Sequence, residues 1–336
     1  MPEWMKNSEF KEDIVVSTRV RLARNVKGVA FPNKIRSKAE VNHIVDIAKK
    51  SFLDHSDFSF IDFSKVNNLE KLKLYERYLI SHEFAKKNYS GLILSRDERL
   101  SIMILEEDHY RLQCIMPSLN IDAAFKYVDE MDNMLALYAK YAFIEKLGYL
   151  SACPTNVGTG MRVSVMMNLP ALNLSGEIKD VIKNLKRIGQ TCRGAFGEGS
   201  NSLGDLFQIS NEVTLGYSEL EILESVTASV NEIIAMEKET QKKLYMGSPS
   251  FIEDRIFRAH GVLKNARVIS SKEMLQCISY VNMGASLGLI AGVDMEKLYA
   301  LVIDTRPANL ISDDKEVLDE KRRDIKRADI VRRYIK

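Results

Sequence analysis

Three short apolar segments in close succession constrain the fold of this chain more than any other feature of its sequence. Residues 91–95, 100–105 and 110–116 each have the length and composition of a β-strand, and the third returns alongside the second. Segment 100–105 is apolar throughout, which indicates burial on both faces. The acidic run 106–108 then lies at or near the turn between two paired strands.

Helical patterns and further strands fill the rest of the first 247 residues. The expected helices begin near Ser37, Asn120, Ser175 and Ser218, and the last three end near residues 146, 189 and 244. The expected further strands span residues 161–169 and 205–210. Ser37 and Ser218 each stand three residues before a glutamate, which is the capping-box arrangement at a helix start. The pattern predicts an α+β fold with an antiparallel sheet flanked by helices.

Glycine and proline at residues 246–250 mark the best candidate for a domain boundary, because they follow a long helical pattern. Beyond them almost every segment is helical. Ser270 and Glu273 form another capping box, Asp294 can cap a short helix, and the C-terminal residues form a charged helix. We predict a catalytic domain over residues 1–247 and a smaller, all-helical domain over residues 251–336.

Composition argues against several classes of protein. The chain has 48 basic and 46 acidic residues, so its net charge of +2 is far from that of a dedicated nucleic-acid-binding domain. The N-terminal residues contain no apolar run and no segment approaches about 18 apolar residues, so we expect neither a signal peptide nor a membrane span. Four widely spaced cysteines (Cys114, Cys153, Cys192 and Cys277) predict free thiols, no protein-bound metal and a cytoplasmic protein.

The common nucleotide-binding motifs are absent from the sequence. It contains no G-x-x-x-x-G-K-[ST], H-R-D or D-F-G, so neither a P-loop enzyme nor a eukaryotic protein-kinase fold is expected. Arg19 and Arg21, however, would share one face of a strand, and two guanidinium forks on one face suit a triphosphate. Taken alone, two such arginines more often form a solvated surface.

Three further segments carry residues suited to chemistry. The acidic run 106–108 concentrates carboxylates that need a guanidinium or magnesium ion to offset their repulsion, although an acidic turn in solvent is the simpler interpretation. Residues 153–162 and 193–205 each combine glycines with an arginine, Arg162 and Arg193, and are suited to close approach to a ligand or to closure over substrate. An ordinary turn and a connecting loop are the alternatives. None of these segments alone is specific for a function, but their combination in this order is.

In that order the segments STRVRLARN, EEDH with its following arginine, CPTNVGTGMRVSV, RGAFGEG and ISNEVTLGYSE resemble the phosphagen (guanidino) kinase family over residues 17–219. Within it the chain looks most like the McsB-type bacterial protein arginine kinases. Only sixteen residues precede the first arginine motif, where creatine and arginine kinases carry a helical domain, and RDIKRA at residues 323–328 resembles the R-D-x-x-R-A motif of that branch. The resemblance implies a phosphagen-kinase-like catalytic domain that uses ATP and Mg²⁺.

The resemblance also implies roles for individual residues. Glu107 and Glu198 would flank the substrate guanidinium and be catalytic, Glu106 would act on magnesium through water, and Cys153 would lie beside the guanidinium. The residues implied for ATP are Ser17, Thr18, Arg19, Val20, Arg21, His82 (at the adenine), Arg111, Arg162, Val163, Ser164, Val165, Met166, Arg193, Gly194, Ala195, Phe196 and Gly197. Those implied for phosphoarginine in the helical domain are Arg323, Asp324, Arg327 and Ala328.

The chain departs from the family pattern at two positions. Leu105 replaces the asparagine that precedes the glutamates, and Gly199 replaces the histidine that follows the loop glutamate in many small-guanidine kinases. Neither change removes a group needed for proton transfer. Both limit any detailed analogy of substrate specificity.

We therefore expect an ATP:protein-arginine N-phosphotransferase. The missing N-terminal domain should leave the acceptor side open to arginines on protein surfaces, and the resemblance of residues 323–328 to the R-D-x-x-R-A motif is the stronger argument for protein substrates. A kinase for a free guanidine metabolite and a phosphoarginine-binding regulatory adaptor are the alternatives. The resemblance further implies a role in stress response and protein quality control, with a McsA-type activator, a CtsR-type repressor and a ClpC-type unfoldase as partners. It also implies a homodimer or larger homo-oligomer, without direct contact with nucleic acid or membrane.

Overall fold

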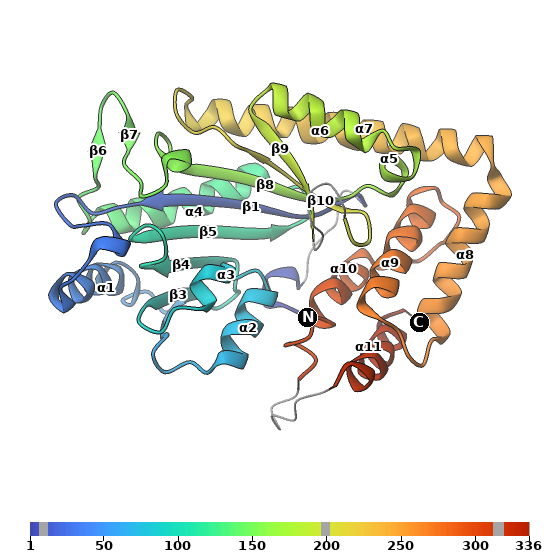
Figure 1. Ribbon diagram of the computed structural model, residues 1–336, viewed down its shortest axis with the longest axis horizontal. Helices are drawn as coiled ribbons and strands as arrows, with labels where there is room; N and C mark the ends of the chain where they lie inside the picture. The colour runs from blue at the N-terminus through green and yellow to red at the C-terminus, as the bar shows by residue number, and fades with distance from the viewer. Residues whose placement is uncertain (7–12, 196–201, 312–318, 336) are drawn as a thin grey trace.

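An eight-stranded antiparallel sheet organises the first part of the chain (Figure 1). The computed structural model describes residues 1–6, 13–195, 202–311 and 319–335. The strand order is β2-β3-β4-β5-β1-β8-β10-β9. The strands are β1 (Val15–Arg24), β2 (Phe58–Asp62), β3 (Gly91–Ser95), β4 (Leu100–Ile104), β5 (Tyr110–Pro117), β8 (Met161–Asn168), β9 (Gln190–Gly194) and β10 (Leu206–Asn211).

Strand β1 lies inside the sheet, between β5 and β8. Arg21 stands opposite Gln113 on β5 and opposite Arg162 on β8. Because side chains alternate between the two faces of a strand, Arg19, Arg21 and Arg162 lie on one face. The register therefore brings together arginines that are more than a hundred residues apart in the sequence.

The opposite face of the sheet carries the main hydrophobic core. Val20, Val163 and Val165 are buried there against helices that cover this side. The helices that contribute to this core are α1 (Lys38–Phe52), α4 (Ile121–Ala136), α6 (Ile178–Arg187) and α7 (Glu219–Gly247). Helices α2 (Asn68–Glu76), α3 (His82–Ala85) and α5 (Pro170–Ser175) are shorter. The arrangement confirms the α+β fold class and leaves the arginine face for a ligand.

Two helix predictions were wrong. Helix α4 ends at Ala136, ten residues earlier than expected, and the chain then forms a hairpin of β6 (Phe143–Ile144) and β7 (Gly148–Tyr149). Gly148 has a φ of 77°, which suits the hairpin turn and not a helix. Ser175 ends α5 rather than beginning a helix, because Gly176 caps α5 in the left-handed conformation and α6 begins only at Ile178.

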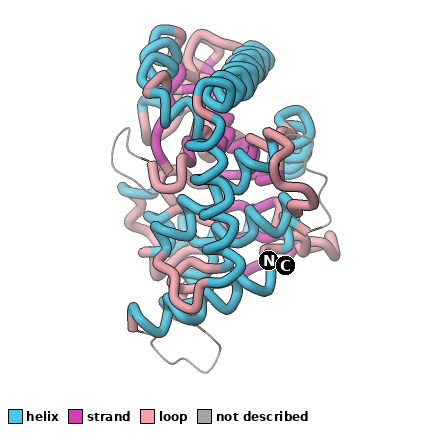
Figure 2. The backbone as a smooth tube through the Cα atoms, turned by 90° about the vertical axis from the view of Figure 1, so that its right-hand side faces the viewer, coloured by secondary structure: helices cyan, strands magenta, loops and turns pink. Residues whose placement is uncertain are grey.

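The C-terminal helical region comprises residues 249–335, and its first helix follows α7 after a break at Ser248. Its helices are α8 (Pro249–Asn265), α9 (Ser271–Ser286), α10 (Met295–Asp304) and α11 (Glu320–Tyr334). Figure 1 shows them packed together at one end of the sheet, far from the β6–β7 hairpin, and Figure 2 shows this helical end facing the viewer. A second hydrophobic core joins this region to the N-terminal residues Trp4 and Met5 and to the sheet.

Polar contacts tie the helical region to the rest of the molecule. The Asp205 carboxylate, just before β10, accepts hydrogen bonds from Gln276 (2.9 Å) and Ser279 (2.7 Å) on α9. The Glu76 carboxylate on α2 accepts the backbone N–H groups of Ala308 and Asn309, both at 3.0 Å. Within the described residues, no helix has both the length and the apolar character needed to cross a membrane.

Candidate active site

A cavity of about 240 Å³ opens on the arginine face of the sheet. Its walls come from β1, β5, β8, the acidic turn after β4 and the loop 153–160. The lining residues that bear functional groups are Arg21, Glu106, Glu107, Asp108, Arg111, Cys153, Thr155, Asn156 and Arg162. The fold thus brings together residues that the sequence places in three separate segments.

The guanidinium groups around this cavity repel one another. Burial, followed by the charge of Arg111, lowers the pKa of Arg19 to about 10, which still leaves it protonated at neutral pH. Burial and the neighbouring charges of Arg19, Arg111 and Arg162 lower the pKa of Arg21 as well. Burial and the charges of Arg193 and Arg111 have the same effect on Arg162. Such crowded cations need an anion to offset their repulsion.

Unsatisfied donors in the cluster also point to an anion. The buried Nε atoms of Arg21 and Arg162 have no hydrogen-bond partner in the described part of the chain. Arg162 donates to the Ser210 hydroxyl at 3.0 Å, and Arg19 donates weakly to Gln208 at 3.4 Å. Because buried polar groups in proteins are nearly always hydrogen-bonded, these donors fit the oxygens of a bound phosphate chain.

The Arg19 end of the cluster borders a second, small cavity of about 20 Å³. Ser17, Arg19, Tyr78, Ser164 and Met166 contribute to its lining, and Tyr78 was not anticipated from the sequence. Tyr78 follows α2 in the left-handed conformation, with a φ of 63°, and its carbonyl accepts a hydrogen bond from Gln113 of β5. No motif marks this tyrosine, because only the tertiary fold brings it beside β1.

His82 lies differently from Tyr78. It opens α3 and its side chain is 58% exposed, next to Glu83 and within 5.5 Å of the Tyr75 ring. It does not line either of the two cavities, whereas its neighbour Ser81 donates a hydrogen bond to Glu106. The adenine role of His82 stays a prediction, and Tyr78 is the competing candidate.

The predicted nucleotide residues divide according to the strand face that they occupy. Thr18, Val20, Val163 and Val165 point away from the cavity, so any contact that they make with a ligand is limited to the backbone. Arg193 is exposed on β9, where it pairs in register with Gln208 and lies 3.9 Å from Glu212. Gly194 ends β9 and Ala195 follows it. Phe196, Gly197, Glu198 and Gly199 lie outside the described residues.

The three carboxylates of the acidic turn have different environments. Both oxygens of Glu106 accept hydrogen bonds from Arg111, at 2.7 and 2.8 Å, and the pKa of this carboxyl is lowered because Arg111 and Ser81 outweigh its burial. Asp108 is buried and accepts hydrogen bonds from Asn25 (2.6 Å), Ser151 (2.9 Å) and the backbone of Ala152 (2.8 Å). Asp108 therefore holds the turn against the rest of the fold.

Glu107 is the exposed member of the turn and lies in the cavity beside Cys153. Partial burial, with the charges of Asp108 and Glu106, raises the pKa of this carboxyl, and a hydrogen bond with the Cys153 thiol partly offsets the rise. A carboxylate with a raised pKa is a better proton acceptor. Glu107 thus has the position and the basicity to take a proton from a cationic substrate.

The turn that presents Glu107 is strained at the residue before Glu106. Leu105 has a φ of 62°, although it is neither glycine nor asparagine. Its side chain is 2% exposed in the main core, so packing holds the backbone in this conformation. Strain of this kind collects at functional sites because the surrounding structure must enforce it.

The motif in α11 lies within the helical region, and its two arginines differ in burial. Arg327 is 3% exposed and donates to the carbonyls of Ile269 (3.0 Å) and Thr305 (3.3 Å) and to the Asp324 carboxylate. Arg323 is half-buried, one turn away, and Ala328 is buried. The phosphoarginine role of these residues stays a prediction.

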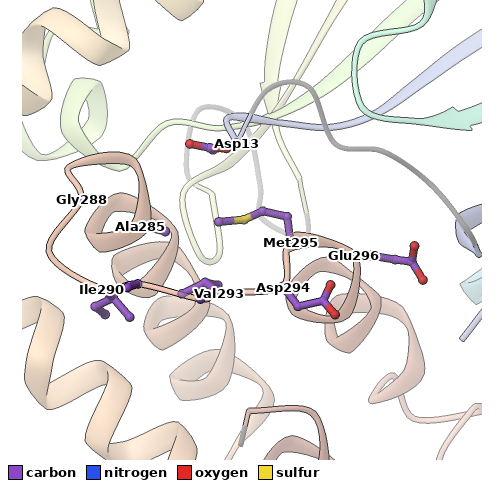
Figure 3. A pocket seen from close by; sticks show the side chains of 10 residues that line it. Asp13, Ala285, Gly288, Ile290, Val293, Asp294, Met295 and Glu296 are labelled. Carbon is purple, nitrogen blue, oxygen red and sulfur yellow. The ribbon is translucent and has the colours of Figure 1, made fainter.

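A larger cavity, of about 600 Å³, lies at the start of α10 and away from the arginine cluster (Figure 3). Its charged lining consists of Asp13, Asp294 and Glu296, which does not suit a phosphate chain. Among the described residues, no group of three or more histidine, cysteine, aspartate and glutamate side chains is placed to hold a metal ion.

Comparisons with known proteins agree with this geometry. Residues 40–240 match the family described as ATP:guanido phosphotransferase, C-terminal catalytic domain, and residues 249–336 match the protein-arginine kinase McsB C-terminal domain. A protein-arginine kinase of Geobacillus sp. (strain WCH70) is 41% identical, over 99% of this chain and 93% of that protein. That of Clostridium acetobutylicum is 41% identical over 100% of both chains. The crystal structure of lombricine kinase is 25% identical, with a TM-score of 0.61 over 68% of each chain.

Proposed function

The chain belongs to the ATP:guanido phosphotransferase family, in its protein-arginine kinase branch, and from this premise we propose that it transfers the γ-phosphoryl group of ATP to arginine side chains on proteins. The observation that carries the proposal is the crowded arginine face, with unsatisfied buried donors, directly beside Glu107. The arginine face fits a triphosphate, and Glu107 fits a guanidinium. The match of residues 249–336 to the McsB C-terminal domain favours protein substrates over free guanidines.

The arginines would bind and position the nucleotide. Arg19 lines the small cavity and would lie on the adenosine side, whereas Arg21, Arg111 and Arg162 line the larger cavity, where the transferring phosphoryl group would sit. Phosphoryl transfer needs little covalent participation from the protein, so catalysis is mostly positioning and charge stabilisation. Fixed guanidinium groups in a partly buried cavity supply both.

The acceptor side would be organised by Glu107. A guanidinium nitrogen attacks the γ-phosphorus, a new N–P bond forms, and the bond to the bridging oxygen breaks with its electron pair leaving on ADP. The attacking nitrogen gives its proton to the Glu107 carboxylate, which is needed because a guanidinium is otherwise a poor nucleophile. Glu198, outside the described residues, is proposed for the other side of the guanidinium.

Magnesium would enter with ATP and supply further positive charge beside its phosphates. The cavity offers it the carboxylate of Glu106, whose oxygens already accept hydrogen bonds from Arg111. That pairing fits contact through a water molecule better than direct coordination.

The proposal extends to the cellular role of the enzyme, its partners and its oligomeric state. We propose a cytoplasmic enzyme of stress response and protein quality control, which works with a McsA-type activator, a CtsR-type repressor and a ClpC-type unfoldase. We also propose a homodimer or larger homo-oligomer. The near balance of 48 basic and 46 acidic residues supports contacts with proteins rather than with nucleic acid.

The decisive experiment is to incubate the protein with magnesium, ATP and a mixture of folded proteins, and to analyse the mixture by mass spectrometry under conditions that preserve acid-labile N–P bonds. Free arginine at the same concentration of guanidinium groups serves as the competing acceptor. Phosphoarginine in the proteins is the expected result. Turnover of free arginine alone would establish a metabolite kinase instead, and phosphoarginine binding without turnover would establish an adaptor.

A further inference from the structure

We propose that an apolar groove next to the catalytic cavity binds the segment of a substrate protein that adjoins the target arginine. We call it the hairpin groove and define it by Phe143, Leu147, Tyr149, Leu215, Tyr217 and Glu219. Its volume is about 360 Å³. The inference rests on the proposed function, because it names the surface that would distinguish a protein from a free guanidine.

The side chains of the groove are unusually exposed for their type. Phe143 is 52% exposed, Leu215 48% and Tyr217 53%, and they come from two separate segments of the chain. Scattered apolar residues on a surface are ordinary, but a group that lines one hollow marks an interaction site. Aromatic side chains are enriched at the centres of such sites because each buries a large area.

The hairpin groove and the catalytic cavity share a wall. The loop 153–160 contributes Cys153, Thr155 and Asn156 to the cavity, and Gly158 and Thr159 to the groove. The loop therefore separates the two hollows: the cavity lies on the arginine face of the sheet, and the groove lies toward the face that α4 and α7 cover, beside Arg24 and Glu219. A polypeptide whose arginine enters the cavity would cross this loop to reach the groove, and an extended chain advances about 3.3 Å per residue.

Hydrogen bonds fix this shared wall to both sides of the groove. The Tyr149 N–H donates to the Gly158 carbonyl at 2.8 Å, and the Thr159 N–H donates to the Thr214 carbonyl at 3.1 Å. A Cβ atom at Gly158 would lie 2.2 Å from the Thr214 carbonyl oxygen, so the backbones are in close contact. The hairpin, the loop and the segment after β10 thus keep a fixed relation to the cavity.

The floor of the groove is supported from below by Arg24. Its guanidinium lies 3.6 Å from the centre of the Tyr149 ring and forms a buried ion pair with Asp132 at 2.7 Å. A surface that is already ordered loses little conformational entropy when a partner binds. The groove is therefore suited to bind a short polypeptide segment at a low entropic cost.

The charges around the groove favour a substrate segment as its occupant. Glu145 and Glu219 contribute carboxylates and Lys146 contributes one ammonium group, so the lining carries one net negative charge. Beneath it, Arg24 lies 3.6 Å from Glu219 and is itself paired with Asp132, so Glu145 is the carboxylate without this contact. Basic residues beside the target arginine would complement this charge, and apolar residues beside it would fill the groove. Figure 1 shows the hairpin at the end of the sheet opposite the helical region, so α8–α11 do not cover it.

The test uses the double variant Phe143→Ser/Tyr217→Ser in the full-length protein. Both side chains are about half exposed, so we expect little loss of stability. Phe257→Ser is the matched control, because Phe257 is 50% exposed on α8, in the helical region. The measurement is kcat and KM for a folded substrate protein, for a blocked arginine tripeptide and for ATP, together with sedimentation velocity.

We expect the double variant to lose at least about tenfold in kcat/KM for the folded protein, mainly through KM, while the tripeptide and ATP values stay within about twofold. Phe257→Ser should match wild type throughout. An unchanged KM for the folded protein would overturn the proposal, as would an equal loss with the tripeptide, which would mean that the variant disturbs the loop 153–160. A change in self-association would reassign the groove to a contact between copies. If wild type phosphorylates no protein, the proposed function fails first.

Discussion

Glu107 differs from its neighbours in the acidic turn, because Glu106 and Asp108 are committed to hydrogen bonds while Glu107 faces the cavity. Its pKa is raised by partial burial and by the two adjacent carboxylates. The base must be ionised to accept a proton. The activity should therefore fall on the acid side at a higher pH than an ordinary glutamate would give.

We expect Glu107→Gln to lower kcat at least about 100-fold, the usual scale for loss of a general base, with KM for ATP unchanged. The measurement is a kcat profile between pH 5 and 9, in which the acid limb of wild type should be missing from the residual activity of the variant. Asp46→Asn, at an exposed carboxylate on α1, is the control. A variant that kept a tenth of the wild-type turnover would remove Glu107 from the proton transfer.

Tyr78 and His82 make opposite predictions for the nucleotide. Tyr78 lines the small cavity with Arg19, and the guanidinium of Arg306 lies 5.6 Å from its ring centre. Loss of an aromatic contact with a base costs about 1–3 kcal/mol, so Tyr78→Leu should raise KM for ATP about tenfold. His82→Ala should leave it unchanged. Steady-state kinetics with ATP varied decides between them, and the reverse pattern would restore His82 to the adenine site.

At the scale of single elements, Glu237 on α7 accepts hydrogen bonds from the start of α5. It is fully buried, and its carboxylate accepts the N–H groups of Ala171 and Leu172, both at 2.9 Å. Burial raises the pKa of Glu237 to about 7. A carboxyl with a higher pKa in the folded state binds its proton more tightly there, so its contribution to stability is full below about pH 4.5 and is lost as the pH rises to about 7.

The free energy of unfolding should accordingly fall by up to about 1.4 kcal/mol per pH unit across this window from the Glu237 contribution. Glu237→Gln should flatten the dependence, because the amide does not titrate. Urea denaturation at a series of pH values measures it, with Glu239→Gln as an exposed control on the same helix. Parallel curves for wild type and Glu237→Gln would contradict the assignment.

The sequence predicted short strands well, because the pattern that marks them lies within a few neighbouring residues. Strand β3 was predicted to the residue and β4 to within one, because apolar runs with turns between them are short-range signals. The end of α4 was missed because Leu137, Tyr138 and Phe143 continue an apolar pattern, although all three are more than half exposed in the structure. Sequence does not show whether an apolar residue is covered.

The candidate site was predictable only in part, for a related reason. The family resemblance predicted the arginines and Glu107 as site residues. The pairing of β1 with both β5 and β8 places Arg19, Arg21 and Arg162 on one face, and that register is a tertiary property. Tyr78 has no motif, and Asp108 carries the same charge as Glu107 while serving the fold. Residue type alone could not separate the structural role of Asp108 from the catalytic role proposed for Glu107.

At the scale of the whole molecule, the two arginines of the α11 motif should separate in function. Arg327 donates to two backbone carbonyls that join α11 to the start of α9 and the end of α10, whereas Arg323 is more accessible. We expect Arg327→Ala to lower the free energy of unfolding by about 1–3 kcal/mol, because it leaves buried acceptors unpaired. We expect Arg323→Ala to weaken phosphoarginine binding with stability unchanged.

Calorimetric titration with free phosphoarginine and thermal unfolding test both variants, with Lys321→Ala, at the exposed start of the same helix, as the control. Equal phosphoarginine affinities for Arg323→Ala and wild type would place any binding site elsewhere. An Arg327→Ala protein as stable as wild type would mean that the buried guanidinium contributes nothing to the packing of the helical region.

The interior position of β1 has a consequence for how such enzymes diversify. A slip of one residue in its register would turn Arg19 and Arg21 into the core, so the nucleotide side tolerates almost no drift. The hairpin β6–β7 is a separate two-stranded unit on the periphery of the same molecule. If the hairpin groove binds the substrate segment as proposed, exchange of the hairpin would change the acceptor preference and leave the arginine face as it is. For an engineer, the hairpin is the segment to graft.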